Sequence, residues 1–190
     1  VRFLRKLLRC AFMWHLPQSS IKNIASADVI LTQGVSLLKD GSPGPGNKIL
    51  ADVLRELHER FPEKPIIPQE ELSLAAPELP YFAVAKRPKG GTAHHSNTAW
   101  NTEAVVAFQY AICEKNGWKK AAVVAVPDHQ GRTVMTMERF GFAPIIVPVP
   151  GPQKIYFHPD CFYWSQRGPR WRFLLREFLC RMYFLLSLRL

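Results

Sequence analysis

The strongest candidate for chemistry is a group of polar residues that directly follows the apolar run 121–126. This group contains Asp128, His129 and Arg132. An imidazole can exchange protons near neutral pH, and a guanidinium one helical turn further on can bind an anion at the start of a helix. Asp128 could accept a hydrogen bond from the imidazole or coordinate a cation. We therefore predict catalytic roles for Asp128 and His129 and a ligand-binding role for Arg132.

The same three residues also have a purely structural interpretation. Asp128 could be the N-cap of a helix, because its carboxylate can accept hydrogen bonds from free backbone N–H groups. His129 and Arg132 would then be exposed in the first helical turn. The residues alone leave both interpretations open.

Two further polar groups stand next to predicted strands or helices. Asn101 and Thr102 precede an apolar helical stripe and could hydrogen-bond a ligand, although either could instead cap the helix. Gln33 and Gly34 end the first predicted strand, where glycine permits close approach of a ligand to the backbone or simply forms a tight turn. We assign all four residues to ligand binding.

Several familiar kinds of site are not indicated. The loop 41–46 matches neither the dinucleotide-binding nor the phosphate-binding glycine pattern. No Gly-x-Ser-x-Gly motif supports a serine nucleophile. His94 and His95 could join His129 or Asp128 around a metal ion, but adjacent histidines rarely both face one ion, so we predict no metal site.

The elements that must position these residues alternate between strands and helices. The unit 121–149 has the length of a strand–helix–strand crossover, which implies a parallel sheet whose carboxyl ends carry the polar residues. Pro148 indicates that its last strand lies at an edge. We predict a three-layer, Rossmann-like α/β fold. Strands are expected at 28–34, 65–68, 81–85, 121–126 and 145–149, and helices at 49–61, 101–116 and 133–140.

The last 24 residues predict a basic amphipathic helix. Arg172 and Arg176 lie opposite its apolar face, and Glu177 stands four residues before Arg181 as a favourable pair. The helix could pack on the domain with its arginines outward, or lie in a bilayer interface. The apolar face comprises Trp171, Leu174, Leu175, Phe178, Met182, Leu185 and Leu186.

The net charge of +10 over 190 residues is concentrated at the two ends of the chain. Residues 1–9 carry four basic and no acidic residues, and residues 167–190 carry six arginines and one glutamate. The nearly neutral middle shows no nucleic-acid motif, so nucleic-acid binding is not expected. We divide the chain into a basic segment (1–24), an α/β domain (25–166) and the terminal helix (167–190).

Cysteine spacing and hydropathy bear on the compartment. Four widely spaced cysteines fit a reducing environment, and no run of about 20 apolar residues predicts a transmembrane helix. We therefore expect a cytoplasmic protein with possible membrane association through its ends. The oligomeric state cannot be read from the sequence.

In chain order these features resemble the SanA/YdcF-like family, a bacterial family of largely unknown function with links to the cell envelope. The most specific part is 121–142, with the run Val123–Arg132 and the segment 137–142, and the segment 173–177 is also similar. The resemblance implies a Rossmann-like fold with a site around Gly34, Thr102, Glu103, His129 and Arg132, and it adds Glu103 as a catalytic candidate. It also implies S-adenosylmethionine as a possible cofactor.

Two functions follow as expectations. The first is binding of a small anionic or nucleotide-like ligand at the carboxyl ends of the strands, with or without a reaction. The second is docking to a membrane surface or a partner through the basic, aromatic ends of the chain.

Overall fold

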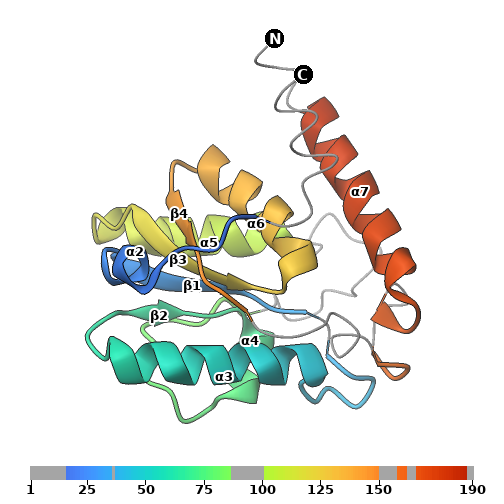
Figure 1. Cartoon of the computed structure of the whole chain (residues 1–190), viewed down its shortest axis with the longest axis horizontal. Helices are drawn as coiled ribbons and strands as arrows, with labels where there is room; N and C mark the ends of the chain where they lie inside the picture. The colour runs from blue at the N-terminus through green and yellow to red at the C-terminus, as the bar shows by residue number, and fades with distance from the viewer. Residues whose placement is uncertain (1–15, 36, 87–100, 150–157, 162–165, 188–190) are drawn as a thin grey trace.

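The computed structural model describes residues 16–35, 37–86, 101–149, 158–161 and 166–187. Four parallel strands form one sheet in the order β2-β1-β3-β4, and helices cover both of its faces (Figure 1). The predicted α/β fold is confirmed. The strands are β1 (Val29–Gln33), β2 (Ile66–Ile67), β3 (Lys120–Ala125) and β4 (Ala143–Ile146).

The two central strands are buried along nearly their whole length. All of β1 is buried, and so is β3 after its first residue. A strand covered on both faces needs such a continuous apolar run, and this is why the sequence predicts both strands well. Their register pairs Val29 with Ala121 and Gln33 with Ala125, so the two carboxyl ends lie level with each other.

Alternate side chains of the strands enter two separate cores. Ile30 packs with Leu50 and Leu54 of α3 (Pro45–Arg60) on one face. Leu31 packs on the other face, where α5 (Thr102–Lys115) and α6 (Pro127–Arg139) supply Val106 and Met137, among others. This division produces the three layers, because successive residues of a strand point to opposite faces.

The order of the strands creates a reversal between β1 and β3. The chain leaves β1 for β2 on one side and then crosses to β3 on the other side of β1. In open parallel sheets, ligands bind outside the carboxyl ends at such a reversal. Gly34, next to the end of β1, and the first turn of α6, after β3, therefore flank the expected position of a ligand.

Some predicted boundaries are wrong. Residues 81–85 form no strand, and Ala85 makes only an isolated parallel bridge to Gln69. The strand β4 lies at the edge as expected but ends at Ile146, before Pro148. The helix α2 (Ile21–Ala25) contacts β4, and Ile24 belongs to the core. A further helix in the described part of the chain is α4 (Glu70–Ala75).

The terminal helix α7 (Arg170–Ser187) stands beyond the ends of the strands, against α6 (Figure 1). Its packing face differs in part from the predicted one. Among the side chains of this helix that the structure describes, Phe173, Glu177 and Arg181 are buried, while Trp171 and Leu175 of the predicted apolar face are exposed. The other described members of that face, Leu174, Phe178 and Met182, are half-buried. The physical reason is a network of ion pairs that reaches the charged face of the helix.

Within the described part of the chain, no helix has both the length and the apolar character needed to cross a bilayer.

Candidate functional site

The site begins where β3 passes directly into α6. Val126 is the N-cap of α6 and Pro127 its first residue, a position that suits the fixed φ angle and the missing N–H group of proline. This short connection places Asp128 and His129 in the first turn, beside the end of the strand. The capping interpretation of Asp128 is wrong, since Asp128 is not the N-cap and its side chain is buried.

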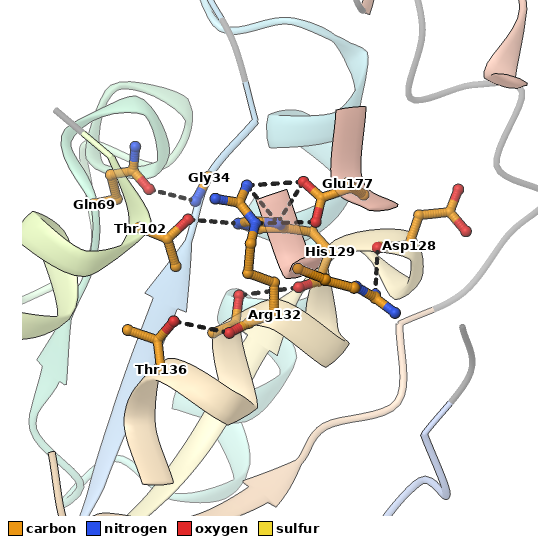
Figure 2. Close-up of polar contacts among 10 residues, drawn as sticks. Gly34, Gln69, Thr102, Asp128, His129, Arg132, Thr136 and Glu177 are labelled. Carbon is orange, nitrogen blue, oxygen red and sulfur yellow. Dashed lines mark hydrogen bonds and ion pairs between the residues drawn. The ribbon is translucent and has the colours of Figure 1, made fainter. Parts of the chain in front are cut away.

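His129 is buried among three polar side chains (Figure 2). Its Nε2 atom lies 3.3 Å from the Thr102 hydroxyl, and its Nδ1 atom lies 3.2 Å from Oε1 of Glu177 and 3.3 Å from Nη2 of Arg132. With the ring proton on Nδ1, the imidazole donates to Glu177 and accepts from Thr102 at Nε2. The ring is therefore held in one orientation from both sides.

Glu177 and Arg132 form a two-pronged ion pair. Nε of Arg132 donates to Oε2 over 3.0 Å, and Nη2 donates to Oε1 over 2.8 Å. The Glu177 side chain is fully buried, whereas that of Arg132 keeps 15% of its surface exposed. Such paired geometry fixes both side chains more firmly than a single contact would.

The charges of this cluster shift the protonation of its members. Burial lowers the pKa of His129, the charge of Glu177 opposes that effect, and the charge of Arg132 adds to it. Burial alone would raise the pKa of the Glu177 carboxyl, but Arg132 and His129 together hold this pKa well below its usual range. The cluster at neutral pH therefore consists of a neutral imidazole beside an ionised pair.

Asp128 does not take part in this cluster. Its carboxylate accepts from Nε and Nη2 of Arg170, over 2.8 and 2.6 Å, and points away from the imidazole (Figure 2). The prediction that Asp128 accepts a hydrogen bond from the imidazole is wrong, because Glu177 occupies that role. Asp128 instead fastens the first turn of α7 to the first turn of α6.

The residues after β1 are fixed by their own contacts. The Gln33 amide donates to Oε1 of Gln109 over 3.3 Å, and the Gly34 N–H donates to Oε1 of Gln69 over 2.9 Å. A Cβ atom on Gly34 would lie 2.8 Å from Cδ1 of Leu72, so a larger residue here would make the Leu72 side chain move. Gly34 therefore permits the close approach that the sequence predicted, but its close neighbour is helix α4 and not a ligand.

The three residues at the start of α5 have separate positions. Asn101 is the N-cap, since its Oδ1 accepts from the Ala104 N–H over 2.9 Å, so the capping interpretation holds for Asn101. Thr102 is buried and faces His129. Glu103 is exposed and lies 3.3 Å from Arg139, so the structure does not bring its carboxylate to the imidazole.

Glu177 is the site residue that the sequence reasoning missed as a partner of His129. The sequence contained a signal, because Glu177 is the single acidic residue in a segment with six arginines. Its spacing to Arg181 predicted a pair within the helix, whereas its contacts with His129 and Arg132 join two helices. Arg181 is also buried in α7, and its Nη2 donates to the carbonyl oxygen of Asp128 over 3.3 Å.

Other places in the molecule offer little chemistry. An open pocket at the amino end of the sheet is lined by residues such as Ser19, Asn23 and Lys120, none of which is a predicted site residue. Among the described residues, no three or more His, Cys, Asp or Glu side chains are grouped as metal ligands. His94 and His95 lie outside the described residues.

Fold and site together define a parallel α/β protein with a buried polar cluster at the carboxyl ends of its central strands. Comparison of the chain with protein-family models, curated proteins and solved structures found no match. The resemblance to the SanA/YdcF-like family therefore depends only on the residues quoted for it and stays a prediction.

Proposed function

We propose that the carboxyl edge of the sheet binds a small ligand that carries a phosphate or carboxylate group. Arg132 would contact the anion, and His129 and Thr102 would orient the ligand beside it. The observation that carries the proposal is the two-pronged grip of Arg132 on the Glu177 carboxylate at the reversal point of the sheet. The Glu177 carboxylate thus shows that the Arg132 guanidinium can bind an anion through two hydrogen bonds at once.

Room for a second anion follows from the donor count of Arg132. A guanidinium has five N–H donors, and Glu177 engages the Nε and Nη2 groups. The Arg132 side chain is 15% exposed, so it is buried less completely than that of Glu177. The first turn of α6 adds the partial positive charge of a helix N-terminus, which favours an anion at the same place.

The chemistry of the proposed site depends on His129. A neutral imidazole held between Thr102 and Glu177 can accept a proton at one nitrogen while the carboxylate stabilises the charged ring. This arrangement would suit general acid–base catalysis on a bound ligand. The proposal covers binding with or without a reaction. A nucleotide-like molecule and S-adenosylmethionine are the candidate ligands, and the cytoplasm is the proposed compartment.

Thermal shift measurements test the proposal with three probes: inorganic phosphate, a nucleoside monophosphate and S-adenosylmethionine. We expect at least one probe to raise the melting temperature of the wild-type chain. The shift should be lost in His129→Ala and reduced in Thr102→Val, each compared with the same variant without probe. Arg139→Gln is the matched control, because Arg139 lies exposed at the far end of the same helix.

Two results would count against the proposal. A shift of equal size in wild type and His129→Ala would place the binding elsewhere. The absence of a shift with all three probes would remove the support for an anion site at this edge.

A further inference from the structure

The outward side of α7 carries a row of large apolar side chains. Trp171, Leu175, Leu179 and Tyr183 are 58%, 47%, 57% and 75% exposed. They are spaced four residues apart, so they form one row along the helix. We propose that this row docks α7 onto the surface of an anionic lipid bilayer, with the helix lying in the plane of the interface.

The orientation of α7 is fixed by contacts on its other side. Glu177 is paired with Arg132, and Arg170 is paired with Asp128. Turning the helix to bury the apolar row would break both pairs and leave buried charges without partners, which is strongly unfavourable. The exposure of the row is therefore maintained by the ion pairs with α6.

The charges beside the row favour an anionic partner. Arg172 and Arg176 are partly exposed, and the Arg172 guanidinium lies 5.7 Å from the centre of the Trp171 ring. Glu177, the single acidic residue of α7, is buried on the opposite side. Long arginine side chains can reach lipid headgroups while their stems lie along apolar surface. Basic residues close to an anionic bilayer strengthen such binding.

The shape of the row favours a bilayer over other occupants. A single straight helix presents a convex ridge, which a flat bilayer receives without a complementary groove. A second copy of the chain would bring Arg172 and Arg176 of one molecule toward the same arginines of the other.

The inference is independent of the proposed ligand site. The row lies on the face of α7 opposite Glu177, whereas His129 and Arg132 contact Thr102 and Glu177. Substitutions in the row therefore test docking without changing the polar cluster.

Vesicle co-sedimentation of the full chain is the experiment. The vesicles contain phosphatidylcholine alone or phosphatidylcholine mixed with phosphatidylserine. We expect binding to the mixed vesicles, weakened by added salt. The double substitution Leu175→Gln and Leu179→Gln should weaken binding roughly tenfold or more, because each exposed leucine would otherwise be buried in the interface.

The matched control is Leu74→Gln, which changes a leucine that is 50% exposed on α4, a helix outside the proposed docking face. This variant should bind like the wild type. Arg172→Ser should weaken binding to the mixed vesicles more than binding to phosphatidylcholine alone.

Three outcomes would overturn the inference. One is a wild-type chain that does not sediment with the mixed vesicles. Another is equal binding by the wild type and the double variant. The third is a dimer that the double substitution dissociates, without vesicle binding, which would assign the row to a second copy of the chain.

Discussion

The buried carboxylate of Glu177 connects His129 and Arg132, which belong to α6, with a helix that follows about 40 residues later. Removing a charge from water is costly, and the attraction between Glu177 and Arg132 offsets that cost only while both partners are present. Each of the two residues therefore stabilises the protein chiefly through the other.

The first prediction concerns this pair and uses a double-mutant cycle. Glu177→Leu alone should lower the free energy of unfolding by about 3–5 kcal/mol, because the charge of Arg132 is left buried and unpaired. Arg132→Met alone should have a similar effect through Glu177. The double variant should be more stable than either single variant, since apolar side chains of similar volume need no charged partner. Urea unfolding measures all three values, and additive losses would contradict the prediction.

At the level of single residues, the sequence predicted the local polar group but not the partners of its members. The local group Asp128, His129 and Arg132 could be predicted, because its position after a strongly apolar strand is visible along the chain. The partner of each could not be predicted. Glu177 and Arg170 lie more than 40 residues away, and residue spacing carries no information on which distant element packs against a helix.

At the level of elements, α7 departs from the usual rule that the apolar face of an amphipathic helix points inward. The side that carries Arg170 and Glu177 points inward here because α6 presents Arg132 and the Asp128 carboxylate to it. The periodicity of the sequence predicts a helix and shows which residues share a face. It does not show which face is buried. The strands β1 and β3 carried no such ambiguity, since both of their faces are buried. The run 81–85 is apolar enough for a strand but forms only one bridge to Gln69.

The second prediction concerns the contact between α6 and α7 at Gly131. A Cβ atom at this position would lie 2.7 Å from Nη2 of Arg181, which is fully buried. Overpacking of this kind costs about 1–3 kcal/mol, more than the gain of up to about 1 kcal/mol from replacing a helical glycine by alanine. Gly131→Ala should therefore destabilise the protein.

The control for this variant is the same substitution in an Arg181→Leu background. Without the guanidinium the overlap is removed, so Gly131→Ala should become neutral or stabilising there. Thermal unfolding compares the four chains. An equal loss in both backgrounds would show that Arg181 is not the neighbour that makes glycine necessary.

At the scale of the whole molecule, the order of the strands and the position of α7 produce a single polar region at one end of the sheet. The reversal between β1 and β3 puts the residues after these two strands at the same edge of the sheet, and Glu177 of α7 reaches His129 and Arg132 there (Figure 2). The sequence predicted the crossover of β3, α6 and β4 but not the strand order, which depends on the pairing of β1 with both β2 and β3.

The last prediction concerns the dependence of global stability on pH. The pKa of His129 is lowered in the folded protein, chiefly by burial and further by the charge of Arg132, although Glu177 opposes the shift and Arg176 of α7 adds to it. In the unfolded chain the same imidazole takes up a proton near pH 6.5. The unfolded state therefore binds more protons on acidification, and the protein loses stability as the pH falls from about 7 to about 5.

The depressed pKa of Glu177 acts in the same direction at lower pH. An unfolded glutamate takes up a proton near pH 4.3, whereas the paired carboxylate in the folded protein resists protonation, so a second loss begins below that value. Urea unfolding of wild type and His129→Gln across this range separates the two groups. The variant should show a flatter dependence between about pH 7 and pH 5 and keep the loss at lower pH, because only the imidazole has been removed. Parallel curves for the two proteins over the upper range would exclude His129 as the group responsible.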